Sequence, residues 1–306
     1  MTTEPMSHKE IIEKLRLHYL YTQGLEGGVR ADFTGANLEG VNLKGVVGIS
    51  PNFTCANFSG ANMAGVDLVY AFMPGVDLSG ANLSNARLGW SCLNGAQLDG
   101  ANLSGADMAH ARLMGAELEG ANLSGAHMGS SNLVRAKLTR SDMRHVDLTS
   151  ANLTIAEMQS VNLQGANLEG ACLYGAYMGG ANLKGANLKN AILIATNLPN
   201  ANLDGANLSG ANLARANLYG VPIERAVGLS PFICFGPIGP DQDYATIYLD
   251  QDRIQCVGFD GTLKEFEAMM HKITTTGQRG VDECLGLIAL AKTPCGPQPS
   301  TMPMGG

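Results

Sequence analysis

The side chains most often used in metal sites and catalysis are present, but their spacing does not form a site. The six histidines have no metal-ligand spacing. No motif brings Ser, His and Asp together, and no glycine-rich phosphate-binding loop follows a predicted strand. We therefore expect no enzymatic activity, no cofactor and no bound metal. The histidines are residues 8, 18, 110, 127, 145 and 271.

Two D-x-D pairs, Asp241/Asp243 and Asp250/Asp252, have a spacing that could suggest calcium. They lack the glycine and the glutamate of an EF-hand loop, so a calcium site is not expected. The seven cysteines are odd in number and have no CxxC spacing. This usage favours a reducing compartment over a disulfide framework.

The distribution of charge argues against nucleic acid as a direct partner. The net charge of −7 divides into 0 for residues 1–30, −3 for 31–220 and −4 for 221–306, so no basic field exists. No apolar run has the length of a membrane span, and no signal peptide precedes the repeats described next. A cytoplasmic protein is the expectation.

A five-residue motif repeats in one frame from residue 31 to residue 220, as in ANLSG at 101–105 and ANLKG at 181–185. The central position is Leu, Met or Phe in 37 of the 38 repeats, the exception being Gly48, and the first position is Ala in 27. A period of five matches neither a helix nor a flat strand. It indicates a short extended piece followed by a turn, which is typical of a solenoid.

Each position of the repeat holds a residue type that suits this structure. Alternate residues of an extended chain point the same way, so the small first residue and the large central residue share an inward face. The second residue, usually Asn or Asp, points outward. A glycine commonly stands at the fifth position and permits the turn.

The phrase A-(N/D)-L-x-x resembles the repeat of the pentapeptide repeat family. This resemblance implies a mainly β fold, a right-handed quadrilateral β-helix with four repeats per coil. At about 4.8 Å per coil, nine or ten coils form a rod roughly 45 Å long. We expect an N-terminal helical cap at residues 1–30, the β-helix at 31–225, a small C-terminal α/β module at 226–295 and a disordered tail at 296–306.

Residues 7–20 predict an amphipathic helix that caps the N-terminal end of the solenoid. Ser7 and Glu10 have the spacing of a capping box. The segment EKLRLHYLYTQGLEGGVRADF also resembles the N-terminal segment of phage-type pentapeptide repeat proteins. The apolar side of the helix is expected to contain Ile11, Ile12, Leu15 and Tyr19.

The repeat pattern is interrupted once, at residues 46–51 (VVGISP). A closely similar segment occurs at residues 226–231 (AVGLSP). Positions 46 and 226 are separated by nine complete coils, so both copies should lie on the same side of a four-sided rod. We interpret them as a corner variant in which Ile49 or Leu229 replaces the central residue. The second copy marks the end of the solenoid.

The sequence after residue 231 predicts the C-terminal module. A short apolar strand is expected at 232–235, and a hairpin is expected from 245–249 and 253–259 around a turn at 250–252.

Two helices should follow these strands. Thr262 and Glu265 have the spacing of a capping box for a helix that ends near residue 273, and 281–292 predicts a second helix. The segments GTLKEFEA and ECLGLIALAK resemble the C-terminal domain of phage-type pentapeptide repeat proteins. This resemblance implies no catalytic or binding chemistry.

Equivalent positions of successive coils should stack as columns along the rod. One column is almost entirely Asn, and hydrogen bonds along it would be structural. Opposite charges across strands contribute about 0.2–1 kcal/mol each, so the charged columns are expected to stabilise the rod itself. The columns are Asn42 to Asn202 with Asp142 among them; Asp67, Arg87, Asp107, His127 and Asp147; and Glu117, Lys137 and Glu157.

Some members of the pentapeptide repeat family resemble duplex DNA in shape and charge and bind type II topoisomerases such as gyrase in its place. DNA carries about one charge per 1.7 Å, so a mimic roughly 45 Å long needs on the order of 26 charges. The repeats contain 13 acidic and 10 basic residues. DNA mimicry is therefore the alternative hypothesis, and an acidic strip on one face stays open.

Apolar residues occupy outward positions on one side of the expected rod, here called the fourth side, where repeats begin at 71, 91, 111, 131, 171 and 191. On its corner Tyr70 should stack under Trp90, the only tryptophan. A contiguous apolar side usually marks a contact, and Trp, Tyr and Arg often anchor interfaces. Cys92, Val134 and Cys172 are also expected to point outward. The candidate interaction surface is Tyr70, Phe72, Trp90, His110, Arg112, Met114, Tyr174, Ile192 and Ile194.

Three hypotheses remain for what contacts this side: a terminal segment of the chain folded back, a second copy of the chain, or a foreign protein. Self-association through the C-terminal module is a further possibility. The main hypothesis is a non-catalytic protein–protein interaction scaffold, which the resemblance of the chain ends extends to a phage-encoded protein acting on a host or phage protein. A structural component of a phage particle is the third hypothesis. Neither a membrane nor nucleic acid is expected as a direct partner.

Overall fold

The computed structural model describes residues 6–46 and 52–228 and, in the C-terminal part, residues 232–238, 243–248, 253–256, 259–262, 264, 265 and 268. The chain divides into two compact units, residues 1–230 and 231–306. In the described part of the chain, the first unit holds an α-helix and the solenoid, and the second holds a small sheet.

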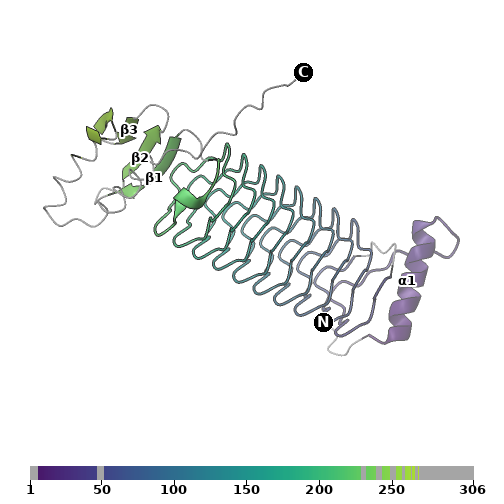
Figure 1. Ribbon diagram of the computed structural model, residues 1–306. Helices are drawn as coiled ribbons and strands as arrows, with labels where there is room; N and C mark the ends of the chain where they lie inside the picture. Colours follow the sequence, from purple (N-terminus) through teal and green to yellow (C-terminus); the bar gives the residue numbers. More distant parts are fainter. Residues whose placement is uncertain are drawn as a thin grey trace, which may run out of the picture. The chain divides into compact units, whose positions relative to one another are not determined.

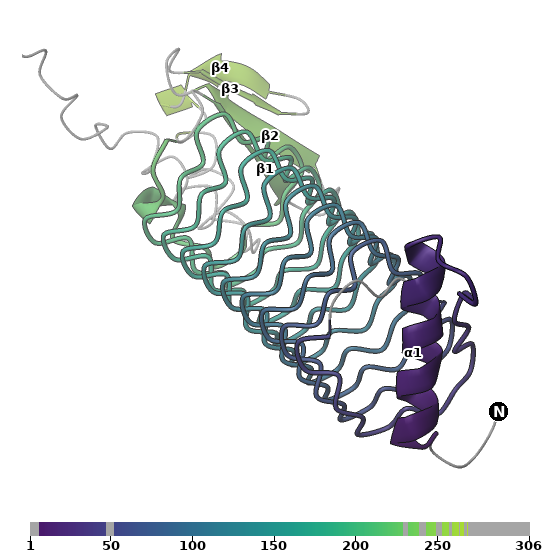
Figure 2. The same ribbon diagram turned by 90° about the vertical axis from the view of Figure 1, so that its right-hand side faces the viewer.

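Stacked coils of four repeats each build the solenoid (Figures 1 and 2). Second-position residues of successive coils are joined by parallel β-bridges, such as Asn82 to Asn102. The bridges begin with Asp32 and Asn52 and end with Asn207 and Val227. The expectation of four repeats per coil is therefore confirmed.

Every backbone N–H group of a typical repeat has a hydrogen-bond partner. The second, third and fifth N–H groups donate to carbonyls of adjacent coils, and the first donates within its own turn. The fourth donates to the Asn side chain two residues earlier. This arrangement explains the preference for Asn or Asp at the second position, since an unpaired N–H costs about 1–3 kcal/mol when buried. In the repeat 121–125 the acceptors are the carbonyl oxygens of Leu118, Ala101, Asp142 and Arg144 and Oδ1 of Asn122.

The first and central residues of the repeats form the core, as predicted. Ala121 and Leu123 are both 0% exposed. A hydrogen bond from the following first residue closes each turn, and the fifth residue has a positive φ, +66° at Gly125. This combination is typical of a type II turn, in which the third turn residue favours glycine.

A short 3₁₀ helix, η1 (Ile223–Arg225), lies near the C-terminal end of the solenoid. Ile223 is 1% exposed and lies one coil after the central Leu203, so it continues the core. The parallel stacking still includes Val227. Ile49 and Leu229, interpreted above as replacements for a central residue, lie outside the described residues.

Helix α1 (His8–Thr22) lies across the N-terminal end of the solenoid (Figure 2). It begins with the predicted capping box: Ser7 Oγ accepts from the N–H of Glu10, and the Glu10 carboxylate accepts from the N–H of Ser7. These bonds satisfy N–H groups that have no partner inside the helix.

The buried stripe of α1 is narrower than the sequence predicts. Ile11 and Leu15 are buried, but Ile12 and Tyr19 are 44% and 54% exposed. His18 completes the stripe instead and is 2% exposed. Positions i, i+4 and i+7 face the coil, because a helix that crosses a flat end contacts it along one line.

Polar contacts join α1 to the first coil. The N–H of Ala31 donates to Nδ1 of His18 at 3.3 Å, and Lys14 Nζ donates to the carbonyl of Asp32 at 3.0 Å. The same ammonium lies 5.1 Å from the centroid of the Phe33 ring, within the range of a cation–π contact.

The C-terminal unit contains a four-stranded antiparallel sheet with the strands in chain order. The predicted hairpin is present as β2 and β3, in which Ile247 pairs with Ile254. The predicted extent of its second strand is wrong, because β3 ends at Cys256 and Phe259 belongs to β4. Gly258 in the sequence favours a turn there. The strands are β1 (Phe232–Ile238), β2 (Asp243–Tyr248), β3 (Arg253–Cys256) and β4 (Phe259–Thr262).

The capping box predicted from Thr262 and Glu265 is present. The N–H of Thr262 donates to the Glu265 carboxylate at 2.8 Å, and the N–H of Glu265 donates to Thr262 Oγ1 at 3.2 Å. The continuation of this helix to residue 273, the second helix at 281–292 and the tail at 296–306 lie outside the described residues.

Candidate functional site

Three aromatic rings stack on consecutive coils at one corner of the solenoid. The ring of Trp90 lies between those of Tyr70 and His110, at centroid distances of 6.4 and 4.1 Å and interplanar angles of 26° and 17°. Tyr70 is 68% exposed and Trp90 is 53% exposed. The three residues are each one coil apart in the sequence, and they stack in sequence order as predicted.

The backbone places all three residues at positive φ, with values of 62°, 60° and 59°. Their N–H groups donate to carbonyls of the next coil, so the ladder that builds the rod also sets the backbone positions from which the three rings project. Glycine is the commonest residue at this position in the described coils. For a residue with a Cβ, this left-handed conformation is less favourable than the right-handed one by roughly 1–2 kcal/mol.

Phe72, Arg112 and Met114 extend the stack onto the fourth side. Phe72 and Met114 are 46% and 48% exposed, and Arg112 is exposed. Together with Tyr70, Trp90 and His110 they form what we call the aromatic cluster.

Cys92 does not belong to the exposed surface. Parallel bridges place it between Phe72 and Arg112 in one column, and it is only 5% exposed. Cys92 occupies the outward second position, as expected, but it is buried because larger side chains flank its short one on both sides.

Phe72 and Arg112 replace Asn at the second position of their repeats without leaving the N–H two residues later unpaired. Phe72 cannot accept a hydrogen bond, but the residue two positions later is Pro74, which has no N–H. Arg112 leaves the N–H of Met114 without its usual acceptor, and Oδ1 of Asn94 from the preceding coil accepts it at 3.1 Å. Apolar and charged residues can therefore occupy these positions while the turns stay intact.

A second apolar group lies further along the fourth side and at its other corner. Tyr174 and Ile192 were predicted and are 48% and 39% exposed, and Ile194 is half-buried. Ile155 and Tyr177, which are 39% and 44% exposed, adjoin them and were missed. The column analysis could have found both, since Ile155 ends a repeat of the fourth side and Tyr177 begins the next side. We call these five residues the tyrosine–isoleucine cluster.

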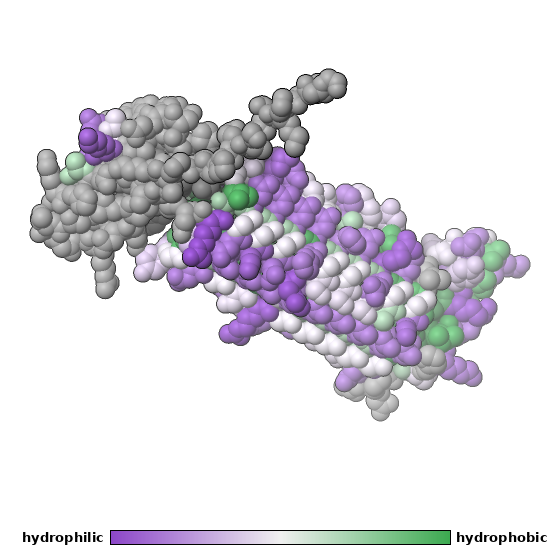
Figure 3. All heavy atoms as spheres, viewed as in Figure 1, coloured by the Kyte–Doolittle hydropathy of each residue, from purple (hydrophilic) through white to green (hydrophobic). Residues whose placement is uncertain are grey.

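The apolar residues of the fourth side are therefore divided into two clusters and are not contiguous as expected. Asn132 and Asn152 occupy outward positions between them, and Val134 is half-buried. In the view of Figure 3, rows of hydrophilic and neutral residues cover most of the solenoid, and hydrophobic residues gather beside α1.

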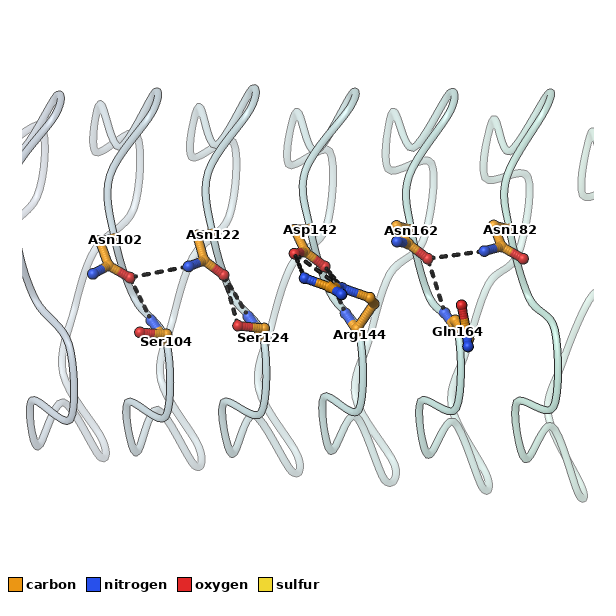
Figure 4. A network of polar contacts seen from close by, with 9 residues as sticks. All are labelled: Asn102, Ser104, Asn122, Ser124, Asp142, Arg144, Asn162, Gln164 and Asn182. Atoms are coloured by element: carbon orange, nitrogen blue, oxygen red, sulfur yellow. Dashed lines mark hydrogen bonds and ion pairs between the residues drawn. The ribbon is translucent and has the colours of Figure 1, made fainter.

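The Asn column is a hydrogen-bonded ladder (Figure 4). Nδ2 of Asn122 donates to Oδ1 of Asn102 at 3.3 Å, and Nδ2 of Asn182 donates to Oδ1 of Asn162 at 3.0 Å. Oδ1 of Asn122 also accepts from the N–H of Ser124 within its own turn. Each amide therefore links coils and closes a turn, so this side is occupied by structural bonds.

Each of the two predicted charge columns contains one salt bridge between neighbouring coils, whereas Asp107, His127, Asp147 and Glu157 form none among the described residues. Arg87 contacts Asp67 at 2.7 Å and Lys137 contacts Glu117 at 2.6 Å. Exposed pairs of this kind contribute little to stability individually. Further pairs join Glu119 to Arg140, Asp142 to Arg144, Glu169 to Lys189 and Asp204 to Arg225.

These pairs also shift the protonation equilibria of their members. The hydrogen bond from Arg144 holds the pKa of Asp142 below its ordinary value (Figure 4). The hydrogen bond to Glu117 raises the pKa of Lys137, and the charge of Glu157 adds to this effect. Both groups are thus kept in their charged forms.

Among the described residues, no group of three or more His, Cys, Asp or Glu side chains could hold a metal ion. In the same part of the chain, no helix is long and apolar enough to cross a membrane.

A family model described as pentapeptide repeats matches the chain in overlapping stretches that together span residues 29–225. The chain belongs to the pentapeptide repeat family. Pentapeptide repeat proteins fold as right-handed quadrilateral β-helices, which agrees with the four-repeat coils described above. They are generally non-enzymatic structural or interaction proteins, and no catalytic family is indicated for this chain.

Several solved pentapeptide repeat structures are similar to the chain. HetL, a protein involved in heterocyst differentiation regulation from the cyanobacterium Nostoc sp. strain PCC 7120, is 32% identical over 72% of this chain and 97% of its own, with a TM-score of 0.37. Rfr23 from the cyanobacterium Cyanothece 51142 is 41% identical over 28% of this chain and 58% of its own, with a TM-score of 0.28.

A third similar structure is full-length QnrB1, a plasmid-mediated fluoroquinolone resistance protein. It is 17% identical over 61% of this chain and 92% of its own, with a TM-score of 0.31. No curated protein matches the chain at a significant level.

Proposed function

We propose that this pentapeptide repeat protein is a non-catalytic scaffold for protein–protein interaction and that the aromatic cluster is its principal contact surface. The observation that carries the proposal is the exposed stack of Tyr70, Trp90 and His110 at positive φ. Three left-handed residues destabilise the solenoid by roughly 1–2 kcal/mol each. An aromatic pair contributes only about 0.5–1.5 kcal/mol beyond its burial. Folding alone gives little reason for aromatic residues at this corner, and binding supplies one.

The composition and rigidity of the cluster support the same function. Trp, Tyr and Arg are the residues that most often carry the binding energy of an interface, and the cluster contains all three. The backbone ladder holds the main chain of Tyr70 and Trp90 in place before any partner binds. A preorganised surface loses less conformational entropy on association.

Photo-crosslinking tests this proposal directly. Trp90 is replaced with the photoreactive amino acid benzoylphenylalanine in the full chain, and crosslinked products are identified by mass spectrometry. Ser130 is the matched control site, because it lies in the same column and also has a positive φ, +56°.

We expect protein crosslinks from residue 90 and few or none from residue 130. If residue 90 crosslinks to no protein, within its own chain or outside it, the proposed contact surface is wrong. Equal crosslinking from both sites would indicate nonspecific contact and would also contradict the proposal.

DNA mimicry toward a topoisomerase is the less favoured function. Six of the 13 acidic residues of the repeats form salt bridges, which lowers the negative potential that a mimic needs. Binding through mimicry weakens steeply with salt, whereas apolar docking does not. A crosslink from residue 90 that persists at high salt therefore favours the aromatic cluster.

A structural role in a phage particle rests on the resemblance of the chain ends alone. Recovery of the protein in purified particles would support that role. Recovery only from soluble lysate would count against it.

A further inference from the structure

We propose that the N-terminal edge of the solenoid binds an extended peptide segment of another protein, which adds beside Asn42 as a parallel β-strand. This site is separate from the aromatic cluster and does not rest on the function proposed for that cluster. Unpaired backbone groups, a groove beside them and two flanking charges carry the inference.

The backbone of the first coil is incompletely paired at the start of the Asn column. One coil later, the N–H of Asn62 donates to the C=O of Val41, and the C=O of Asn62 accepts from the N–H of Leu43. The corresponding N–H and C=O of Asn42, and the C=O of Lys44, have no partner within the described part of the chain. An unpaired strand edge of this kind is a template for another extended chain.

An adjacent side of the same coil shows how such an edge is occupied. The N–H of Met6 donates to the C=O of Asn37 at 2.9 Å, the same bond that Leu38 makes with Asn57 one coil later. Met6 therefore takes the place of the central residue of a preceding coil. The next residues begin α1, so this part of the chain does not continue as a strand beside Asn42.

A groove of about 220 Å³ lies beside the unpaired edge. In a repeat, the first and central side chains point toward the core, so a strand paired with Asn42 would direct two side chains toward this end of the solenoid. A cavity of roughly 150 Å³ holds benzene, so the groove has room for an apolar side chain. The apolar residues that line it are Met6, Ile11, Leu38 and Val41.

Opposite charges flank the open edge. Glu39 precedes Asn42 and Lys44 follows it, both charged side chains are exposed, and neither forms a salt bridge within the described residues. In the parallel register of the solenoid, a bound peptide should therefore carry a basic residue level with Glu39 and an acidic residue level with Lys44. Between these two it needs a small residue, an Asn that extends the Asn column and a large apolar residue. The sequence KGANLEG meets all of these requirements.

Helix α1 excludes a second solenoid from this edge. It lies across the same end of the rod and packs on it through Ile11, Leu15 and His18 (Figure 2). A helix with its side chains is about 10–12 Å across, whereas paired strands lie about 4.8 Å apart. The coil of a second copy therefore cannot approach to the distance of a paired strand, but a single extended peptide can.

Titration of the full-length protein with synthetic peptides, followed by nuclear magnetic resonance, tests the site. The probe is KGANLEG with blocked ends, and the shift of the Asn42 amide signal measures its dissociation constant. EGANLKG is the matched control, because it has the same composition and exchanges the two charges. We expect EGANLKG to bind about five- to tenfold more weakly.

Two further changes test the register. A methyl group on the leucine nitrogen of KGANLEG removes the N–H that would donate to the C=O of Asn42, so binding should weaken about tenfold or more. In the double variant Glu39→Lys/Lys44→Glu the preference should reverse, so that EGANLKG binds more tightly than KGANLEG. Circular dichroism checks that this variant remains folded.

The outcomes separate this inference from the proposed function. An Asn42 amide that is already protected from hydrogen exchange in the free protein would show that the chain covers its own edge, and would overturn the peptide site. Equal binding of all three peptides, or no shift of the Asn42 amide with any of them, would also overturn it. The function proposed for the aromatic cluster fails only if residue 90 contacts no protein.

Discussion

At the second position of each repeat, an Asn or Asp side chain completes the hydrogen bonding of its own turn and can also bond to the neighbouring coil. Asn122 does both, since its Oδ1 accepts from the N–H of Ser124 and its Nδ2 donates to Asn102. Asp142 lacks the amide donor but still accepts from the N–H of Arg144. Closing the turn is therefore the more general of the two roles.

Replacing Asn122 separates these roles. Asn122→Ala leaves the N–H of Ser124 without its acceptor and should lower the free energy of unfolding by about 1–3 kcal/mol. Asn122→Asp keeps the acceptor and loses only the donor, so it should cost clearly less. Urea denaturation followed by circular dichroism measures both variants. Equal losses for the two would show that the ladder, and not the turn, is the main contribution.

Helix α1 covers the N-terminal end of the core through Ile11, Leu15 and His18. His18 is the polar member of this stripe. Its Nδ1 accepts from Ala31, and its buried Nε2 has no partner in the described part of the chain. Nδ1 can accept this bond only when it carries no proton.

The attachment of α1 should therefore depend on pH. Burial, and next the positive charge of Arg30, lower the pKa of His18 below its ordinary value. The unfolded chain binds the proton more readily, so the stability contributed by His18 is present above about pH 6.5 and is lost as the pH falls. Hydrogen-exchange protection factors of α1 should be lower at acidic pH than at neutral pH.

His18→Gln provides the control for this prediction. The amide oxygen can accept a hydrogen bond and does not titrate, so the difference in protection between the two pH values should disappear. Equal protection of α1 at both pH values in the wild type would show that His18 does not link the cap to pH.

The whole solenoid is a stack in which each coil contacts only its neighbours. Its core residues, such as Leu103 and Leu123, are fully buried along one line. Stability in such repeat proteins is approximately a sum of coil and nearest-neighbour terms. Damage to one coil should therefore spread to adjacent coils before it affects distant ones.

Leu123→Asp tests this property of the molecule. An unpaired carboxylate in the core should destabilise the surrounding coils by several kcal/mol. Hydrogen exchange should show lost protection near residue 123 first and retained protection near the ends. Leu123→Met is the matched control, since Met occupies the same position in other coils and such exchanges usually cost less than about 1.5 kcal/mol. Wild-type melting behaviour of Leu123→Asp would contradict the inward position of Leu123.

The repeat period, together with the four repeats per coil that the family resemblance implies, determined most of the fold without any coordinates. Because backbone hydrogen bonds join residues one coil apart, a five-residue pattern with four repeats per coil defines the columns. The stack of Tyr70, Trp90 and His110 and the pairs of Arg87 and Lys137 followed from that spacing. In a solenoid, residues that touch are related by a constant distance in the sequence.

The tertiary structure decided what this constant spacing does not encode. The burial of Cys92 depends on the size of its neighbours, and the narrow stripe of α1 depends on the flat surface against which it packs. Burial at these positions depends on the size and shape of the surrounding residues. The repeat period describes only the spacing along the chain, so it could not predict this burial.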